Sequence, residues 1–215
     1  AGAWVIRNAA FLFPPKSIHL VVVDPGVGTD RNPIVLEVND QLFVGPDNGI
    51  FSLFFEEFSY KAYKLNKPKY WRDVRSRTFH GRDIFSPIAA HLAKGVSLEE
   101  LGDPISDLVS YHWAVPIGDK DGLQGWVIHI DRFGNLITNI SEELIEQTIG
   151  RRKVRIYVGN TMIDHLVNTF EDVAPGEPAA FVGSSGMMEI GINRGNAAEM
   201  LSVDKGTQIS LVLQK

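Results

Sequence analysis

Three side chains suited to polar chemistry lie on two glycine-containing loops of this chain. Asp24 begins the loop 24–31 (DPGVGTDR) and Arg31 ends it, while His80 lies in the segment 78–83 (TFHGRD). Arginine stays protonated in proteins and stabilises negative charge, whereas histidine titrates near neutrality and can handle a proton. An acid, a permanent cation and an imidazole on loops indicate a small catalytic constellation, in which Asp24 orients Arg31 or a water molecule.

Each of these residues also has a simpler interpretation. Pro25 and the two glycines of the first loop can serve only to shape a tight turn closed by an ordinary ion pair, and a single histidine is more often structural. A metal hydrolase would gather Asp24, His80 and Asp83, but no paired-histidine spacing such as H-E-x-x-H occurs, and we expect no metal site. The loop also lacks the third glycine of a dinucleotide fingerprint and the lysine of a P-loop, so it matches a phosphate cradle only weakly.

Three loops in the second half of the chain have the composition of a binding site. The segment 131–135 (DRFGN) combines a carboxylate on Asp131, an aromatic face on Phe133 and an amide on Asn135. Asparagine can read a purine edge and phenylalanine can stack on a base. The loops 183–186 (GSSG) and 193–198 (NRGNAA) offer backbone amides and small side chains. Each of the three segments also has a simpler interpretation as a plain polar turn between strands, which for either of the last two loops taken alone is the more frequent case.

The first half of the chain alternates predicted strands and helices. The apolar run 18–23 indicates a buried strand whose carboxyl end carries Asp24, where open α/β sheets bind ligands. Strands 33–38 and 41–44 form a predicted hairpin across Asn39-Asp40, and 61–65 is a further strand. The helices expected here are 4–13, 50–58, 83–94 with Asp83 as its cap, and a short one opened by a capping box over 97–100.

The second half consists mainly of short predicted strands: 126–131, 136–140, 154–158, 180–182, 189–193 and 208–213. Gly159-Asn160 is a hairpin turn, and Ser141 caps the single expected helix, 142–149. Regularly spaced short strands indicate a small antiparallel barrel or sandwich. We therefore expect an α/β domain over 1–112, a linker over 113–123 and an all-β domain over 124–215.

Composition limits the classes of function. The chain has 215 residues, a net charge of −5 and 44% hydrophobic residues, enough for packed cores. Its 21 Lys and Arg residues form no stripe, which argues against nucleic acid as a partner. Cysteine is absent, which fits a reducing compartment such as the cytoplasm, and no apolar stretch approaches the roughly 20 residues of a membrane span.

Taken together, five segments resemble the S-adenosylmethionine hydrolase family, the adenosine-forming relatives of the bacterial fluorinating and chlorinating enzymes. They follow the family's order over nearly the whole chain: 22–29 (VVDPGVGT), 44–49 (VGPDNG), 78–83 (TFHGRD), 131–135 (DRFGN) and 195–198 (GNAA). Each piece is modest alone, but the combination is highly specific.

The resemblance implies an α/β N-terminal domain and a β-barrel C-terminal domain in homotrimers, with each active site between one subunit's N-domain and its neighbour's C-domain. It implies hydrolysis of S-adenosylmethionine to adenosine and methionine without a metal or cofactor. The family's catalytic set falls on Asp24, Arg31 and His80. By the same resemblance, the remaining site positions are Phe133 and Asn135 for the adenosine portion, Asp131 and Ser184 for the methionine portion, and the backbone around Gly195 and Ala197 for the adenine edge.

Two departures from related patterns matter. The halogenating relatives lack the Asp-Pro-Gly-Val-Gly loop and the histidine, and the fluorinating ones carry a halide-binding serine where this chain has Gly81, so the resemblance favours water as nucleophile. Family members also begin with a Thr-Asp-Phe-Gly segment that binds the ribose hydroxyls, and this chain begins after it, so we expect a sheet lacking its first strand. A non-catalytic nucleoside- or S-adenosylmethionine-binding protein and an S-adenosylmethionine-dependent halogenase remain as alternatives.

Overall fold

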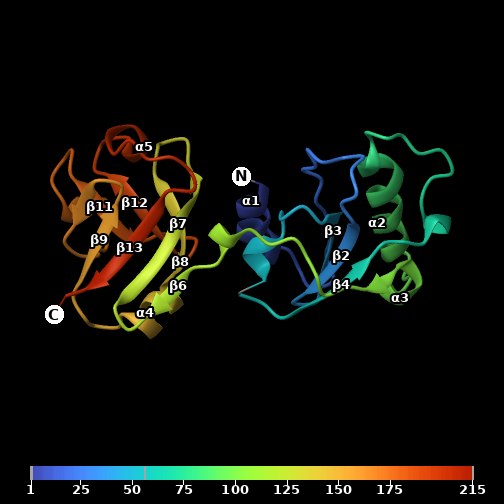
Figure 1. Ribbon diagram of the computed structural model, residues 1–215, viewed down its shortest axis with the longest axis horizontal. Helices are drawn as coiled ribbons and strands as arrows, with labels where there is room; N and C mark the ends of the chain where they lie inside the picture. The colour runs from blue at the N-terminus through green and yellow to red at the C-terminus, as the bar shows by residue number, and fades with distance from the viewer. Residues whose placement is uncertain (1, 56, 215) are drawn as a thin grey trace. The chain divides into compact units, whose positions relative to one another are not determined.

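The computed structural model describes residues 2–55 and 57–214, which form two compact units with a boundary between Tyr111 and His112 (Figure 1). The segment 113–123, expected as a linker, lies within the second unit. It contains most of the 3₁₀ turn η5 (His112–Ala114), the strand β6 (Ile117–Asp119) and the start of β7. No helix among the described residues is long and apolar enough to cross a membrane.

The first unit is built on a five-stranded sheet of order β1-β3-β2-β4-β5, in which only β1 and β3 run parallel. Its strands are β1 (Ile18–Leu20), β2 (Pro33–Val38), β3 (Gln41–Pro46), β4 (Tyr60–Lys64) and β5 (Asp103–Pro104). Its helical elements are α1 (Gly2–Ala9), η1 (Ala10–Leu12), η2 (Ser52–Phe54), η3 (Pro68–Tyr70), the π-helical turn η4 (Gly81–Phe85), α2 (Ser86–Ala93) and α3 (Leu98–Leu101).

Alternation along the strands places a separate core on each face of this sheet. In β2, Ile34 and Leu36 pack in one cluster with Phe43 and residues of η1 and η2, whereas Val35 packs in a second cluster with residues of η4 and α2. Successive strand residues point to opposite faces, so the three consecutive buried apolar residues 34–36 require a cover on both faces of the sheet. Figure 1 shows α1 and α2 on opposite sides of the sheet. The predicted α/β layering is confirmed.

The hairpin and the helix 50–58 show opposite outcomes for sequence prediction. Asn39 and Asp40 adopt φ of 48° and 58°, the left-handed pair that a tight hairpin turn needs. The prediction of a helix over 50–58 was wrong, because the only helical element among the described residues of this segment is the 3₁₀ turn η2. Residue 56 lies outside the described chain. Phe54 packs 4.9 Å from the ring of Phe43, centroid to centroid, and this packing outweighs a weak aromatic preference for helix.

The second unit is an antiparallel sheet of order β10-β9-β13-β7-β8-β12-β11, with β6 beside β7. Its strands after β6 are β7 (Gly122–Ile130), β8 (Leu136–Ser141), β9 (Val154–Val158), β10 (Thr161–Ile163), β11 (Pro178–Val182), β12 (Met187–Ile192) and β13 (Gln208–Leu213). Its remaining elements are α4 (Glu142–Thr148), η6 (Phe170–Asp172) and α5 (Ala197–Met200). The Val167 N–H donates to the carbonyl of Ala180, so the chain after β10 reaches β11 and the sheet nearly closes into the predicted barrel.

The long strand β7 joins the two halves of this sheet. Its first half pairs with β13, with Leu123 opposite Leu211, and its second half pairs with β8, with Ile130 opposite Leu136. Within the pairing with β8, the register shifts between Val127 and His129, just after the last residue paired with β13, Trp126. Such a shift bends a strand, which lets one element serve both walls of a barrel.

Candidate active site

The loop between β1 and β2 carries Asp24 and Arg31. Two turns fold it back on itself, with the Val27 N–H bound to the Asp24 carbonyl and the Thr29 N–H bound to the Gly26 carbonyl. β1 is shorter than predicted, but Val21 still donates to Val44 of β3, so the sheet's hydrogen bonding extends towards Asp24. The folded loop therefore begins close to the end of a sheet strand.

A glycine lets this loop approach the segment that carries His80. Gly28 has φ of 83°, and a Cβ there would lie 2.7 Å from the backbone oxygen of Arg77. A side chain at this position would be strained and would push the two segments apart. The glycines of the D-P-G-V-G segment therefore allow this loop to lie close to the backbone at Arg77 as well as to form a turn.

Asp24 and Arg31 form a buried two-point ion pair. Arg31 Nε donates to Asp24 Oδ1 at 2.9 Å and Nη2 donates to Oδ2, while the two side chains are only 5% and 7% exposed. The guanidinium carbon also lies 5.2 Å from the ring centroid of Phe85. Two parallel hydrogen bonds between a guanidinium and a carboxylate fix the orientation of both groups as well as pairing their charges. Arg31 is therefore held rigidly, and sequence reasoning had no signal for the part played by Phe85.

His80 joins the pair through Arg31. Its Nδ1 lies 3.0 Å from Arg31 Nη2. Because a guanidinium has only donors, Nδ1 must be the acceptor, and this assignment leaves the proton of the neutral ring on Nε2. Burial and the charge of Arg31 lower the pKa of His80, which favours the neutral ring. The structure thus brings Asp24, Arg31 and His80 into one cluster.

Asp83 supports the segment before His80 and does not cap α2 as the sequence suggested. Its fully buried carboxylate accepts hydrogen bonds from Arg82 Nε at 2.7 Å and from the Ser76 N–H at 2.8 Å. The bond to Arg82 and then that to Ser76 lower its pKa to about 2. Asp83 lies inside η4, so its side chain faces the preceding loop, where it anchors residues 72–79.

In the second unit, Asp131 organises the turn between β7 and β8. Its Oδ1 accepts from the Phe133 and Asn135 N–H groups, and its Oδ2 accepts from the Asn135 side chain. Gly134 adopts φ of 87° at the turn. The ring of Phe133 is left 70% exposed. The carboxylate builds the turn, and the aromatic ring projects from it.

A pocket of about 550 Å³ collects several predicted binding residues. It is lined by Phe133, Asn135, Phe170, Ile192, Asn193, Arg194, Gly195 and Asn196. The Ala198 N–H donates to the Gly134 carbonyl and ties the two loops together. Ala197 is fully buried in the core and does not line the pocket. Sequence reasoning missed Phe170, which packs on Phe181 and gives no sequence signal.

Ser184 does not line this pocket. It lies on the hairpin tip before β12, whereas Gly195 follows the opposite end of that strand. Six residues at about 3.3 Å each separate the two ends by roughly 20 Å. Glu189 lies on β12 between them, and burial, followed by the charge of Asp131, raises its pKa. This carboxyl group was not singled out from the sequence.

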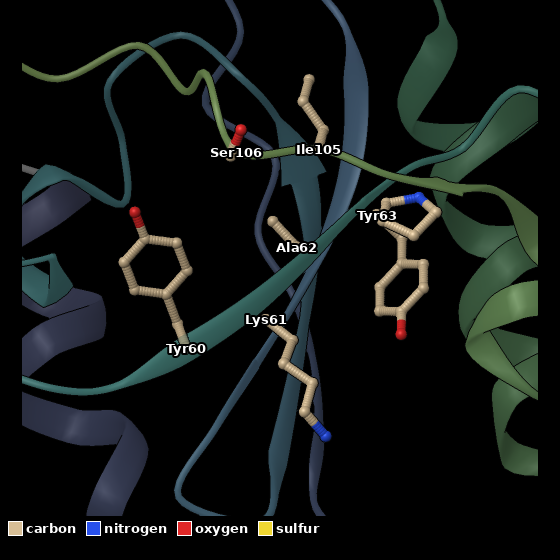
Figure 2. Close-up of a pocket in the computed structure, with 7 residues that line it drawn as sticks. Tyr60, Lys61, Ala62, Tyr63, Ile105 and Ser106 are labelled. Atoms are coloured by element: carbon tan, nitrogen blue, oxygen red, sulfur yellow. The ribbon is translucent and has the colours of Figure 1, made fainter.

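A second pocket in the described chain contains none of the residues predicted for the site. A pocket of about 470 Å³ lies beside β4 and the chain that follows β5, with Tyr60 and Tyr63 extending to either side of the strand (Figure 2). None of the predicted site residues lines it. Within the described chain, no group of three or more His, Asp or Glu side chains could hold a metal ion.

Comparisons with known proteins cover both units. Residues 1–102 match the family described as SAM hydroxide adenosyltransferase N-terminal domain, and residues 125–210 match the corresponding C-terminal domain. A Salinispora tropica protein named (R)-S-adenosyl-L-methionine hydrolase is 37% identical over 97% of this chain and 79% of its own length. A fluorinase from an Actinoplanes species is 25% identical over 98% of this chain and 82% of its own length. The crystal structure of a conserved Thermotoga maritima protein gives a TM-score of 0.84 at 36% identity, covering 98% of this chain and 82% of that one.

Proposed function

The chain belongs to the SAM hydroxide adenosyltransferase family, and on that premise we propose that it hydrolyses S-adenosyl-L-methionine to adenosine and L-methionine. The observation that carries the proposal is the buried cluster of Asp24, Arg31 and His80. A protein that only bound a nucleoside would have no use for a fixed cation beside a neutral imidazole.

The reaction is a displacement at the ribose 5′ carbon. The oxygen of water forms a bond to this carbon, the carbon–sulfur bond breaks, and the electron pair of that bond neutralises the sulfonium. The water proton passes to solvent, and the thioether leaves without needing a proton. The difficulty is the nucleophile, because bulk water has a pKa of about 15.7 and hydroxide is scarce near neutrality.

Two donor groups of the cluster remain for this nucleophile. Arg31 Nη1 has no hydrogen-bond partner among the described residues, and neutral His80 carries its proton on Nε2. Donors fixed in a water-poor site stabilise an oxyanion without reorganising. We infer that Arg31 and His80 stabilise developing hydroxide while Asp24 holds Arg31. His80 then acts as a donor that orients the oxygen, because its Nδ1 is already occupied by Arg31.

The second unit supplies binding chemistry. The exposed face of Phe133 and the Asn135 amide suit a nucleobase, together with the backbone at Gly195. The Asp131 carboxylate provides negative potential that suits the ammonium and sulfonium charges of the substrate. Ser184, at the far end of β12, fits the methionine end of an extended ligand.

Three further features belong to the same proposal. The catalytic cluster and the binding loops lie on different units, which fits a homotrimer whose sites combine one subunit's first unit with its neighbour's second unit. The reaction needs no metal or cofactor, because Arg31 supplies the positive charge. The absence of cysteine fits work in the cytoplasm, on a small-molecule substrate and without nucleic acid or a membrane.

The decisive experiment is chromatography of S-adenosyl-L-methionine incubated with the protein in the presence of a chelator and without added halide. We expect adenosine and methionine in equal amounts, and their loss in His80→Ala. The matched control is His112→Ala, which removes an exposed histidine from another part of the chain and leaves turnover unchanged.

Other products would contradict the proposal. A 5′-chloro nucleoside formed on adding chloride would identify a halogenase, and loss of activity with the chelator would identify a metal-dependent hydrolase. Tight binding of intact substrate without any product would identify a binding protein. Light scattering at the elution peak tests the trimer, and a monomeric active enzyme would rule out shared sites.

A further inference from the structure

A compact cluster of positive charge lies in the second unit, away from the site described above. Arg151, Arg152, Lys153 and Arg155 line a pocket of about 540 Å³ together with Asp164 and His165. The protein as a whole carries a net charge of −5, so this concentration runs against its average. The sequence contains no long cationic stripe, and these residues instead form a short, concave group.

The elements around the pocket hold the cations close together. α4 ends at Thr148, and β9 begins at Val154, so the basic residues occupy the turn between them and the first outward position of the strand. Gln214 donates from its backbone N–H to the Lys153 carbonyl at 2.9 Å, which fixes the start of β9. Like charges brought together in this way repel one another, and an anion between them relieves the repulsion.

One of the four cations is engaged in the fold. Arg152 donates from Nε to the Ile149 carbonyl at 3.0 Å and from Nη2 to the Thr148 carbonyl, so it caps the end of α4. Its charge also lies where the helix dipole is negative. Arg152 is therefore a structural part of the pocket wall, and the remaining capacity for a ligand rests with Arg151, Lys153 and Arg155.

Asp164, the acidic residue in the pocket lining, does not neutralise the basic residues around it. β9 and β10 pair with Ile156 opposite Ile163, which makes Asp164 the cross-strand neighbour of Arg155. In the described part of the chain, Asp164 forms no ion pair within 4.0 Å with any of the basic residues. Arg151, Lys153 and Arg155 are exposed and likewise have no ion pair there. Their donors are free to meet an incoming anion.

The lining selects the class of anion. Guanidinium groups match phosphate oxygens with two parallel donors, and three of the four cations are arginines. The apolar part of the lining consists of Ile149, Val154 and Leu166, and the lining contains no Phe, Tyr or Trp ring on which a base could stack. The volume is that of a small-molecule site. We propose that this pocket binds a small oligophosphate, recognised through its phosphate groups.

Calorimetric titration of the full chain with sodium tripolyphosphate tests the proposal. We expect saturable binding that weakens with salt, and a loss of about tenfold or more in Arg151→Gln/Arg155→Gln, because this variant removes two groups able to make charge-assisted hydrogen bonds to the phosphates. Arg152 is left in place because it caps α4. The matched control, Lys94→Gln/Lys120→Gln, removes two exposed cations outside the pocket and keeps the wild-type affinity. Added tripolyphosphate should raise the melting temperature of the wild type but not of the pocket variant.

Titrations with other ligands identify the source of the phosphate and define the results that would overturn the proposal. ATP binding as tightly as tripolyphosphate supports recognition through the phosphates, and tripolyphosphate binding alone supports a free inorganic ligand. Citrate binding equally well would overturn the choice of phosphate, and an oligonucleotide binding more tightly would assign the cluster to nucleic acid. Equal losses in the pocket and control variants, or no binding up to about 1 mM, would overturn the proposal. All readouts are binding or melting, so they are independent of hydrolase activity.

Discussion

The cluster of Asp24, Arg31 and His80 and the pocket around Phe133 use their side chains in opposite ways. In the cluster, the ion pair is almost fully buried, and Arg31 is also held by His80 and by the ring of Phe85. In the pocket, the turn is fixed by Asp131, and the ring of Phe133 is left exposed. A rigid charge suits transition-state stabilisation, whereas an exposed ring suits ground-state binding. Substitutions in the two regions should therefore affect kcat and KM differently.

Arg31→Lys should have the largest effect. Lysine keeps the charge but loses the fork that holds Asp24 and reaches His80. We expect kcat to fall about 10²- to 10³-fold, as for removal of one oxyanion donor, with adenosine affinity nearly unchanged. Steady-state kinetics and adenosine titration measure the two quantities.

Arg7→Lys is the matched control for this variant. Arg7 also makes a two-point pair with a carboxylate, Glu57, in the same unit. We expect its kcat to equal that of the wild type. An equal loss in both variants would show that the effect is structural and would remove Arg31 from the chemistry.

His80→Gln should lower kcat about 100-fold and change its pH profile. Burial and Arg31 keep the pKa of His80 below 6.5, so the ring protonates only as the pH falls through that lower value. Protonated Nδ1 cannot accept from Arg31, so wild-type activity should decline on the acid side below pH 6.5. Because the unfolded chain binds this proton more readily, folding stability should decline over the same range.

The pH profile of kcat separates this role from a merely structural one. The acid decline should disappear in His80→Gln and persist in His112→Gln. An acid limb unchanged in His80→Gln would mean that another group controls activity.

Phe133→Ala should raise KM about tenfold with kcat nearly constant, because loss of base stacking removes on the order of 1–3 kcal/mol of binding. Tyr157→Ala, which removes another exposed ring from the second unit, is the control and should leave KM unchanged. A drop in kcat equal to the rise in KM would break the distinction between the two regions.

Asp83→Asn should have the smallest effect on turnover and act on acid stability. The pKa of Asp83 is about 2 in the folded protein against 3.8 as its ordinary value. This lowered pKa favours folding above pH 3.8, and the contribution is lost as the pH falls towards 2. Melting temperatures measured between these values should fall less steeply in Asp83→Asn than in the wild type. Asp204→Asn, at an exposed carboxylate, is the control, and identical slopes in all three proteins would contradict the role of Asp83.

Local signals in the sequence predicted the elements that local chemistry controls. Ser97 and Glu100 form the expected capping box, and Ser141 accepts from the Leu144 N–H at the start of α4. The Asn39-Asp40 turn likewise follows from residues that tolerate positive φ. Each of these features depends on contacts within a few residues.

Features that depend on distant contacts were missed. The helix over 50–58 failed because Phe54 packs on Phe43 of β3. Asp83 was assigned to a cap because nothing in the sequence indicates its bond to Ser76 through a π-helical turn. The spacing of Asp24 and Arg31 suggested their ion pair, but the direction of the His80 hydrogen bond required coordinates. The roles of these site residues stay predictions until the variants are measured.

The double pairing of β7 sets the order in which the second unit can be completed. β7 leaves the ribosome before β8, but one of the two partners of its first half, β13, is the last strand among the described residues. Closing contacts so distant in sequence slows folding. The backbone edge of β7 that pairs with β13 therefore stays unpaired until β13 has been synthesised, and an unpaired strand edge makes a stalled or shortened chain prone to aggregation.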